Sequence, residues 1–497
     1  MTSSPQKLSL FASAALLFAG TALAQNVPTY HATPNRHGAY TVTGLTPAAA
    51  ASLKPLAGFS ATISGDVYAQ PLYWKTSGQS NGEIIQVTEN NIVYSLNATT
   101  GTVNWSTQLA PAAPLSAFPC GNINPEGITG TPVIDPVHHV IYLNALTYSA
   151  SKSAQHLLYG ISLNTGAILS GWPLDIGAAL TAKGVSFSAL TQGQRSALQI
   201  FNGNVYVNYG GKAGDCGTYH GTVVQVDTTT KTVTASWSTR ANGGGIWAQG
   251  GLAREGSTFF ATTGNTMGAT TWEDGEAIVR LLPGLAHSTE TADYFAPTDW
   301  LSLDESDSDL GGTEAIPFSV AASGGKSVGR VIALGKDGNA YLVNQAKLGG
   351  IGGQIQEVNE SSSQIITAPV VYESPSETLV AFTNHGSLSP CSGTSITALK
   401  IAATGTSPIS AAWCAGFNGA GSPIITTSDG TSNPIVWVTG AEGDNQVHGF
   451  NALTGAVVFS GSGTTMQGLR HFGTLIAAQG NLYVGADNTV YAFTFTP

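Results

Sequence analysis

Residues 91–109 read NIVYSLNATTGTVNWSTQL, and this stretch contains the pattern that decides the fold. Apolar residues alternate with polar ones, a small polar turn ends on Thr-Gly, and a second run reaches Trp105. Such alternation is typical of a strand with one buried face, and glycine can adopt the positive φ that a tight hairpin needs. The stretch therefore predicts a β-hairpin.

The same pattern recurs along most of the chain. Further copies lie at residues 157–174, 221–239, 339–358, 395–414 and 445–461, with a weaker copy at 275–295 and a truncated one at 488–495. A second strand pair precedes most copies, so each unit has about four strands. Units that repeat every roughly 50 to 65 residues are typical of sheets that bury their faces against one another around an axis. We predict an all-β fold, a single β-propeller of about eight four-stranded blades.

The last copy lacks its turn and its outer strand. The N-terminal stretch TYHATPNRHGAYTVTGL, residues 29–45, could complete that blade and close the ring, which would leave no free edge between the first and last blades. A row of separate β-sandwich domains is the alternative interpretation. No Pro- or Ser-rich linkers separate the copies, which favours one closed ring.

Residues 1–24 have the order of a cleaved secretory signal. Lys7 precedes an apolar run, and the run ends on Ala22-Leu23-Ala24. A signal-anchor is the alternative, but the apolar part is short and a small-residue cleavage site follows. We expect cleavage before Gln25, a propeller domain over residues 25–497, no membrane span, and a periplasmic or extracellular location.

The balance of charge narrows the choice of partners. The chain has 18 Lys and Arg residues against 29 Asp and Glu residues, a net charge of -11, and it contains no run of basic residues. Proteins that follow a phosphate backbone or an anionic bilayer need such runs. We therefore expect no binding of nucleic acid. We expect a monomer, with a small molecule or a glycan bound in the axial funnel.

Four cysteines, Cys120, Cys216, Cys391 and Cys414, allow three disulfide pairings in an exported chain. Cys391 and Cys414 flank the predicted hairpin at 395–413, so neighbouring strands could bring them together. That pairing leaves Cys120 with Cys216. Metal binding by these thiols is a weaker alternative because no C-x-x-C spacing occurs.

The unit of a strand, Asp or Asn, Thr-Gly and Trp resembles the repeat of pyrroloquinoline-quinone (PQQ) dehydrogenase propellers, the quinoprotein alcohol dehydrogenase-like superfamily. The order GDVYAQPLYW (65–74), GITGTPVID (127–135), GDCGTYHG (214–221), GGGIWAQGG (243–251), DLGG (309–312) and GKDGNAYLVN (335–344) is similar to that of secreted bacterial PQQ-like repeat proteins. The resemblance covers nearly the whole mature chain. It implies the fold strongly and the chemistry weakly.

The resemblance implies roles for three residues. In that family a quinone lies between a tryptophan and a disulfide of two adjacent cysteines, and a calcium or lanthanide ion is held by a glutamate and an asparagine. GGGIW places Trp247 as the stacking ring, and ATTGN places Asn265 as the metal ligand. Lys336 matches a basic residue that polarises the quinone carbonyls. A planar quinone gains from stacking on an indole, and a hard cation takes oxygen ligands.

The carboxylates are matched less closely. The metal-binding glutamate of the family falls near Asp215, whose side chain is shorter. The catalytic aspartate falls in the run LDESDSDLGG, residues 303–312, where Asp307 and Asp309 are the nearest matches.

Other positions depart from the family pattern. Pro119-Cys120 stands where two adjacent cysteines are expected, so Cys120 alone remains at the second plate of the cofactor site. Asn124-Pro125-Glu126-Gly127 lacks the arginine of the family, and Tyr68 replaces a common glutamate. The site is therefore expected to be partly degenerate.

Each candidate also has a structural interpretation. Trp247 could be a core aromatic that plugs the axis, Asn265 a turn residue that tolerates left-handed φ, and Lys336 part of a hairpin turn. The acidic run at 304–309 is also typical of a solvated loop. His385 and His471 precede predicted strands and could face the funnel or make structural hydrogen bonds.

Two functions of different classes follow. The first is an exported quinoprotein-type oxidoreductase, a PQQ-dependent alcohol or sugar dehydrogenase with Ca²⁺. The second is a propeller without cofactor or redox chemistry that binds a glycan or a protein, or cleaves carbohydrate. The chain has no haem-attachment C-x-x-C-H, so electrons from a dehydrogenase would leave to a separate acceptor.

Overall fold

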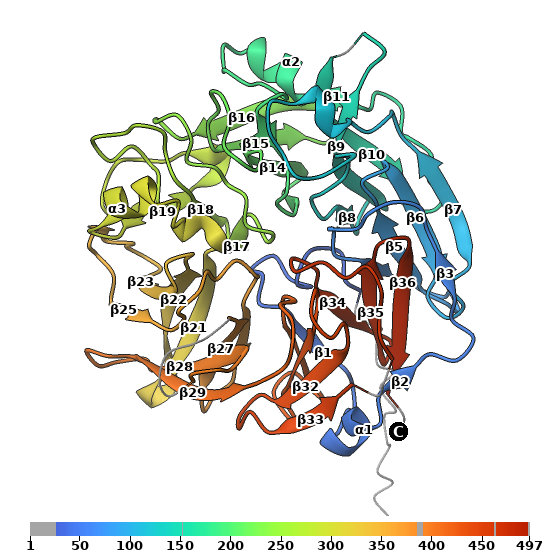
Figure 1. Ribbon diagram of the computed structural model, residues 1–497, viewed down its shortest axis with the longest axis vertical. Helices are drawn as coiled ribbons and strands as arrows, with labels where there is room; N and C mark the ends of the chain where they lie inside the picture. Colours follow the sequence, from blue (N-terminus) through green and yellow to red (C-terminus); the bar gives the residue numbers. More distant parts are fainter. Residues whose placement is uncertain (1–25, 152, 385–390, 462–463, 496–497) are drawn as a thin grey trace, which may run out of the picture.

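The computed structural model describes residues 26–151, 153–384, 391–461 and 464–495, which form eight β-sheets arranged as blades around one axis (Figure 1). Each described sheet has four or five strands, and the strand pairings within a blade are antiparallel apart from two short parallel pairs. The predicted all-β propeller of eight four-stranded blades is confirmed. The predicted signal sequence at 1–24 and His385 lie outside the described residues.

The first four blades follow one another along the chain. The first contains β4 (Leu72–Trp74), β5 (Glu83–Val87), β6 (Ile92–Asn97) and β7 (Val103–Gln108), and the second contains β8 (Val133–Asp135), β9 (Val140–Tyr148), β10 (Ala154–Ser162) and β11 (Leu174–Asp175). The third contains β12 (Gln192–Gly193), β13 (Gln199–Phe201), β14 (Asn204–Gly211), β15 (Thr222–Asp227) and β16 (Thr232–Ser238). The fourth contains β17 (Ala253–Glu255), β18 (Thr258–Thr263), β19 (Ala277–Leu281), β20 (Tyr294–Ala296) and the later β24 (Gly350–Ile351).

The remaining blades complete the ring. The fifth contains β21 (Ile316–Ala322), β22 (Lys326–Leu334), β23 (Asn339–Asn344) and β25 (Gln356–Asn359), and the sixth contains β26 (Val370–Glu373), β27 (Thr378–Thr383), β28 (Ile396–Ile401) and β29 (Ile409–Ala415). The seventh contains β30 (Ile424–Thr427), β31 (Ile435–Thr439), β32 (Val447–Asn451) and β33 (Val457–Ser460), joined by β1 (Ala39–Thr41). The eighth contains β34 (Leu475–Ala478), β35 (Asn481–Ala486) and β36 (Thr489–Thr494), joined by β2 (Lys54–Pro55) and β3 (Ala61–Thr62).

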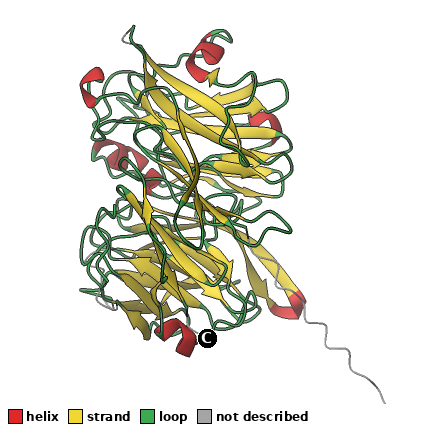
Figure 2. Ribbon diagram, turned by 90° about the vertical axis from the view of Figure 1, so that its right-hand side faces the viewer, coloured by secondary structure: helices red, strands yellow, loops and turns green. Residues whose placement is uncertain are grey.

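The helices are short and lie in the connections outside the sheets (Figure 2). They are α1 (Pro47–Ala51), α2 (Ile176–Thr181), α3 (Trp300–Glu305) and the 3-10 turns η1 (Leu115–Ala117), η2 (Pro283–Leu285), η3 (Leu310–Gly312) and η4 (Ser323–Gly325). Among the described residues, no helix has the length and apolar character to cross a membrane.

The N-terminal part of the chain closes the ring, but not with the stretch expected from the sequence. The outer strands of the eighth blade are β2 and β3, which both pair with β36. The stretch at 29–45 instead supplies β1, which pairs parallel with β30 on the seventh blade. The strands β2 and β3 were not predicted because each is two residues long and has too little alternation to be recognised as a strand.

The repeat residues hold neighbouring blades together. Trp105, at the end of the first copy, donates from its indole Nε1 to the carbonyl of Leu163 at 3.1 Å. Its ring covers Gly166 in the Thr-Gly turn of the next blade, where a Cβ would lie 2.5 Å from the indole. Gly166 has φ 73°, so both the conformation and the contact require glycine. Trp413 docks in the same way on the seventh blade.

The stretch at 29–37 passes through the interior of the ring. Arg36 is fully buried and donates to the carbonyls of Leu198 and Leu252, which belong to the parts of the chain that form the third and fourth blades. It also donates to the hydroxyl of Thr29 and to the carbonyl of Tyr30. Burial lowers the pKa of Arg36 to about 10. This buried cation ties the N-terminal stretch to two blades.

Both predicted disulfides are present. Cys391 pairs with Cys414 on β29, and Cys120 pairs with Cys216, with Cα atoms 5.6 and 6.0 Å apart respectively. The first joins neighbouring segments of the sixth blade. The second joins two connections that lie 96 residues apart in the sequence, beside the site described next.

Candidate functional site

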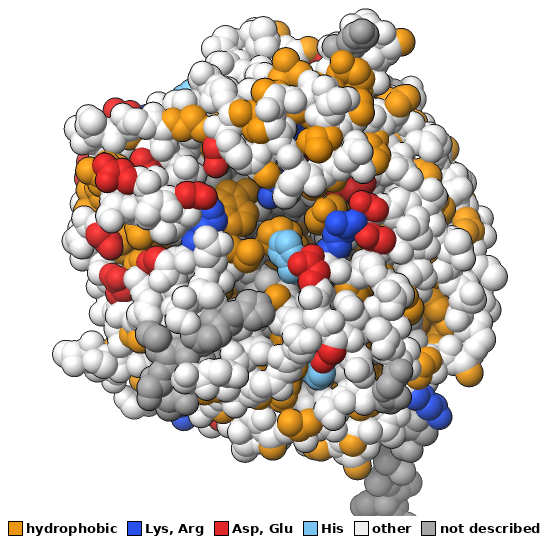
Figure 3. Space-filling view, in the orientation of Figure 1, with side chains coloured by type: hydrophobic (Ala, Val, Ile, Leu, Met, Phe, Trp, Pro, Cys, Tyr) orange, Lys and Arg blue, Asp and Glu red, His pale blue; other side chains and the backbone are white. Residues whose placement is uncertain are grey.

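Three adjoining pockets open where the axis meets one face of the ring. In Figure 3, basic, acidic and histidine side chains surround a hollow near the centre of this face. The charged pocket, of about 230 Å³, is lined by Arg195, Asp215, Trp247, Asn265, Asp307, Asp309 and Lys336 among others. The narrow pocket, of about 50 Å³, includes Tyr30, Tyr68, Ile123, Thr131, Arg195, Gln249, His471 and Phe472. The hydroxyl pocket, of about 350 Å³, includes Ser363, Gln364, Thr367, Thr383, Asn384, Glu442 and His471.

Shared residues show that the pockets form one funnel. The charged and narrow pockets share Arg195 and Phe472, and the charged and hydroxyl pockets share Gln364 and Ile366. His471 lines both the narrow and the hydroxyl pockets. A ligand in one pocket is therefore next to the others.

The glycine run at 243–245 places Trp247 in the charged pocket. Gly243 and Gly244 have φ 91° and 64°, and the amide of Gly244 donates to the carbonyl of Asn265 at 2.7 Å. Gly264 donates in turn to the carbonyl of Gly245 at 3.0 Å. Bare backbone thus lets two connections of neighbouring blades touch, and the contact brings the indole of Trp247 and the amide side chain of Asn265 to one wall.

Lys336 and Asp309 form the electrostatic centre of this pocket. The Nζ atom of Lys336 lies 2.6 Å from Oδ2 of Asp309, 2.8 Å from Oδ1 of Asp307, and 5.2 Å from the centre of the Trp247 ring. Burial alone would lower the pKa of Lys336, but the two aspartates outweigh it and raise the pKa. Lys336 therefore stays charged against the indole. Lys336 also lies in the turn between β22 and β23, so it is both part of a hairpin turn and a residue of the pocket.

The two candidate catalytic aspartates differ in position. The Asp309 side chain is 4 % exposed, and its Oδ1 accepts from the amide of Asn265 at 2.8 Å. The Asp307 side chain is 65 % exposed and reaches Lys336 from the rim of the pocket. Of the two, Asp309 is the carboxylate that the fold holds inside the pocket.

Asp215 and Asn265, the candidate metal ligands, line the same pocket. Oδ1 of Asp215 accepts from the hydroxyl of Tyr219 at 2.7 Å, and burial, with smaller contributions from Asp309 and Asp307, raises the pKa of Asp215. Within the described residues, no group of three or more His, Cys, Asp or Glu side chains is arranged to hold an ion. The protein thus offers an incomplete set of oxygen donors, which a ligand with its own oxygens would have to complete.

Cys120 does not line the charged pocket in the described part of the chain. Cys120 lies next to the pocket wall, because its Cβ would be 3.5 Å from a Cβ on Gly214, which lines the pocket. Its disulfide partner Cys216 directly follows Asp215, so the bond joins the connection that carries the candidate metal ligand to the connection of Cys120.

Tyr68, the residue found where the family has a glutamate, lies in the narrow pocket. Its hydroxyl accepts from Nη1 of Arg470 at 3.0 Å, and the guanidinium lies 4.7 Å from its ring centre. Arg470 is neutralised by Asp66 and Asp487 at 2.6 and 2.7 Å. Tyr68 therefore belongs to a closed ion-pair network rather than to the wall around Trp247.

Sequence reasoning missed two basic residues of the funnel, Arg195 and Lys212. Lys212 is buried, pairs with Glu126 at 2.7 Å and lies 3.9 Å from the ring centre of Phe118. Burial lowers the pKa of Lys212 despite the pair. Glu126 stands next to the position where the family has an arginine. Its cationic partner, Lys212, comes from another blade. No local motif marks Lys212 or Arg195, so only the fold identifies them.

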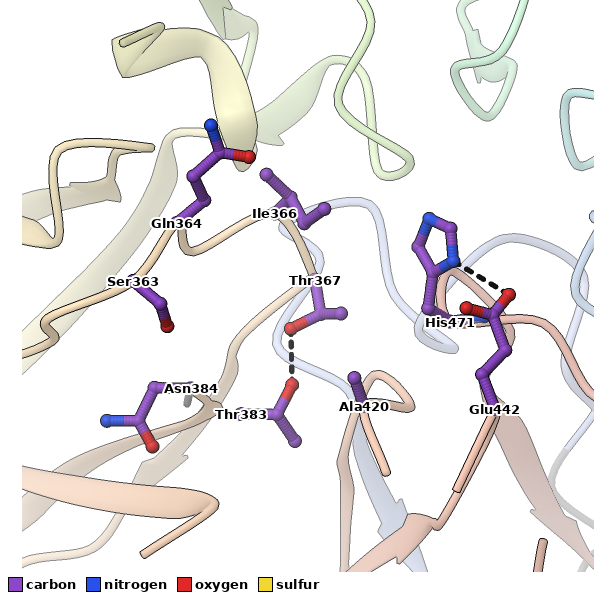
Figure 4. Close-up of a pocket in the computed structure, with 9 residues that line it drawn as sticks. All are labelled: Ser363, Gln364, Ile366, Thr367, Thr383, Asn384, Ala420, Glu442 and His471. Atoms are coloured by element: carbon purple, nitrogen blue, oxygen red, sulfur yellow. Dashed lines mark hydrogen bonds and ion pairs between the residues drawn. The ribbon is translucent and has the colours of Figure 1, made fainter. Parts of the chain in front are cut away.

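His471, for which the sequence left both a place in the funnel and a structural hydrogen bond open, has both. Nδ1 of His471 lies 2.8 Å from Oε1 of Glu442, and the hydroxyls of Thr367 and Thr383 are hydrogen bonded to each other on the other side of the same pocket (Figure 4). Five of the nine residues that line this pocket carry neutral hydroxyl or amide groups.

Comparison with known proteins supports the fold but identifies no relative by sequence. No protein-family model matches the sequence, and no curated protein matches it. Among solved structures, quinohemoprotein alcohol dehydrogenase ADHIIG from Pseudomonas putida HK5 is 14 % identical, with a TM-score of 0.64 over 95 % of this chain and 80 % of that one. The quinohemoprotein alcohol dehydrogenase of Comamonas testosteroni gives 14 % and 0.64 over 94 % and 80 %.

A europium-containing methanol dehydrogenase is similar over 95 % of this chain and 98 % of its own, at 12 % identity and a TM-score of 0.64. The chain therefore has the eight-bladed propeller fold of the quinoprotein dehydrogenases, in agreement with the resemblance noted in the sequence. At these identities the likeness establishes the fold alone.

Proposed function

We propose that the charged pocket binds a planar quinone of the PQQ type and that the protein is an exported quinoprotein-type oxidoreductase acting on an alcohol or a sugar. The observation that carries the proposal is that the candidate residues, although far apart in the sequence, meet in one pocket. Trp247, Asn265, Asp309, Lys336 and Asp215 come from five separate connections and line one pocket at the axis.

The wall around Trp247 suits an anionic planar ligand. The indole offers a stacking face, and aromatic stacking contributes about 0.5–1.5 kcal/mol beyond the area it buries. Lys336 and Arg195 supply positive charge for the carboxylates and carbonyl oxygens of the ligand. When bound, the quinone would supply the capacity to accept two electrons from a substrate.

The donor set favours Ca²⁺ only together with the quinone. Calcium takes six to eight oxygen ligands, whereas this wall offers mainly the amide oxygen of Asn265 and the carboxylate of Asp215. The quinone would contribute the remaining oxygens with water. We infer that the free protein binds Ca²⁺ weakly and that the quinone and the ion bind together.

Asp309 is the best-placed proton acceptor for a substrate hydroxyl. It is buried, it lies at the pocket wall, and the amide of Asn265 fixes its orientation at 2.8 Å. The Nζ atom of Lys336 lies 2.6 Å from its Oδ2 and helps to hold the carboxylate in place. General base catalysis needs a carboxylate held within hydrogen-bond reach of the proton that it removes.

The direct test is a titration of purified protein with PQQ in the presence of CaCl₂ or of EDTA, followed by absorbance and thermal unfolding. Saturation at a hundredfold excess over Kd should stabilise the fold by about 2.7 kcal/mol. We expect uptake with Ca²⁺ and weaker uptake with EDTA. Absence of uptake under both conditions would exclude a quinoprotein function.

A second function is favoured by the hydroxyl pocket. Its neutral hydroxyl and amide groups suit a glycan, with no need for cofactor or redox chemistry. In that case the protein would retain oligosaccharides with or without PQQ. Retention on a glycan array, tested with cofactor-free protein, distinguishes the two functions.

We also propose that residues 1–24 are removed during export to the periplasm or exterior and that the propeller, residues 25–497, acts as a monomer. Two disulfides are consistent with an oxidising compartment. N-terminal sequencing of the secreted protein and light scattering would test both points.

A further inference from the structure

Arg195 differs from the other basic side chains around the funnel. Lys212, Lys336 and Arg470 each have a carboxylate oxygen within 2.7 Å of a side-chain nitrogen. Arg195 makes no such ion pair within the part of the chain that the structure describes, and its Nη2 donates to the neutral amide oxygen of Asn122 at 3.2 Å. A half-buried guanidinium without a counter-charge is a binding group for an anion.

A buried acceptor in the same narrow pocket is also without a partner. Gln249 is 8 % exposed and lines the pocket, and its Oε1 has no hydrogen bond among the described residues. Leaving a buried polar atom unpaired lowers stability. Gln249 lines the pocket, so a turn of its side chain toward the pocket would let this atom accept from a ligand hydroxyl and would remove that cost.

His471 provides a second acceptor at the mouth of the narrow pocket. Its Nδ1 is held by Glu442 at 2.8 Å, so in the neutral ring Nδ1 carries the proton and Nε2 accepts. Figure 4 shows this second ring nitrogen turned away from Glu442. The carboxylate thus orients the ring and leaves an acceptor for a ligand hydroxyl.

The size of the pocket limits the ligand. The narrow pocket has a volume of about 50 Å³, and a single water needs roughly 10–15 Å³. The pocket therefore accommodates only a few non-hydrogen atoms, with further room where it meets the charged pocket. Ile123, Tyr68 and Phe472 supply apolar contacts for a short carbon chain. Aromatic and aliphatic walls with a few convergent polar groups are typical of small-molecule sites.

We propose that the narrow pocket is a binding site for a small hydroxylated carboxylate. Arg195 pairs with the carboxylate, and Gln249 Oε1 and His471 Nε2 accept from the hydroxyl. The site goes beyond the quinone site proposed above. The two pockets share Arg195, but Gln249 and His471, which bind the hydroxyl, line only the narrow pocket of the two.

The test uses three probes of nearly equal size on cofactor-free protein: lactate, lactamide and propionate. Lactamide lacks the charge, and propionate lacks the hydroxyl. We expect calorimetry to show that lactate binds at least about tenfold more tightly than lactamide and about threefold more tightly than propionate. Equal binding of lactate and lactamide, or no binding of lactate at about 10 mM, would overturn the proposal.

Variants assign the effect to the pocket. Arg195→Gln should weaken lactate binding about tenfold or more, and Arg195→Lys should restore part of it, since the charge is kept but the paired donors are lost. Gln249→Leu should reduce the preference for lactate over propionate without changing propionate binding. Arg254→Gln is the matched control, because Arg254 lies on β17 and is not among the residues that line the funnel.

Folding and function are separated by two further measurements. The lactate-to-lactamide ratio in the unmodified protein needs no variant, so it is unaffected by any loss of stability. The quinone titration is carried out on a separate sample without lactate. Wild-type binding of lactate by Arg195→Gln would contradict the site even if PQQ binds, and failure of PQQ to bind would leave the lactate result intact.

Discussion

The charged pocket and the hydroxyl pocket meet at Gln364 and Ile366, yet they differ in how many charged side chains line them. One gathers two lysines, an arginine and three aspartates around an indole. In the other, five of the nine lining residues carry neutral hydroxyl or amide groups, and one His-Glu pair lies at the edge. Both are built by the same kind of four-stranded blade. This difference shows that the repeat determines which positions face the axis. The connections between strands determine which polar and charged side chains occupy those positions.

The two disulfides offer the largest test of this contrast. Cys120–Cys216 closes a loop of 96 residues beside the charged pocket, and Cys391–Cys414 closes one of 23 residues in the sixth blade. The chain-entropy model gives about 4–5 kcal/mol for the first and about 3 kcal/mol for the second. We expect Cys120→Ala/Cys216→Ala to lower stability more, in denaturant unfolding, and also to weaken quinone binding. Equal loss of quinone binding in Cys391→Ala/Cys414→Ala would contradict a local role.

Trp247 should carry most of the affinity of the charged pocket. Trp247→Ala removes the stacking face and should weaken PQQ binding about a hundredfold, or about 3 kcal/mol. Trp272→Ala is the control, because Trp272 belongs to the same part of the ring but stacks on Tyr294, with ring centres 4.0 Å apart. Absorbance titrations compare the variants. If Trp247→Ala binds PQQ as the wild type does, the indole only fills the axis.

Lys336 should contribute less than the indole. Lys336→Met removes the charge next to Trp247 and should weaken PQQ binding about tenfold, whereas Lys336→Arg should retain most of the affinity. Thr383→Val, in the hydroxyl pocket, should leave PQQ binding unchanged and weaken only glycan retention. The same titrations measure both effects. An equal response to Lys336→Met and Thr383→Val would break the distinction between the two pockets.

A further contrast concerns a buried acid outside both pockets. Glu89, in the turn between β5 and β6, is fully buried, and burial raises its pKa from 4.5 to about 8 although the amide of Gly127 donates to it at 2.6 Å. Between these values the folded protein holds a proton that the unfolded chain releases, so this contribution to stability is present below pH 4.5 and is lost as the pH rises through 8.

Thermal unfolding from pH 5 to 9 tests this linkage. Glu89→Gln should flatten the fall in stability toward alkaline pH, because the amide cannot ionise. Glu255→Gln, at an exposed position on β17, should follow the wild-type profile. An unchanged pH profile in Glu89→Gln would show that Glu89 is not the group responsible.

Much of the fold could be predicted because its signals are local. The Thr-Gly turn at Gly101 and the alternation on either side of it specify a hairpin without reference to the rest of the chain. Both disulfides followed from the position of Cys391 and Cys414 around one hairpin. The closing strands β2 and β3 were missed, because strands of two residues have no periodicity of their own and form only against β36.

The candidate site was predictable only in part. Trp247, Asn265 and Lys336 lie in motifs that resemble those of a known family, and that resemblance let them be expected at the site. Arg195 and Lys212 lie outside those motifs, and their roles depend on Asn122 and Glu126, which are 73 and 86 residues away. Pairings over such distances are set by the closed ring.

By itself the sequence determined the blades, their approximate number and the disulfide partners, because alternation, turn glycines and hairpin-flanking cysteines act over short stretches of chain. Only the tertiary structure decided which segment closes the ring and that Cys120 is not among the residues lining the charged pocket. It also decided that Arg195, unlike the other basic groups around the funnel, has no acidic partner among the described residues. These properties depend on distances between residues remote in sequence. Charge pairing and desolvation are therefore settled only once the eight blades surround a common axis.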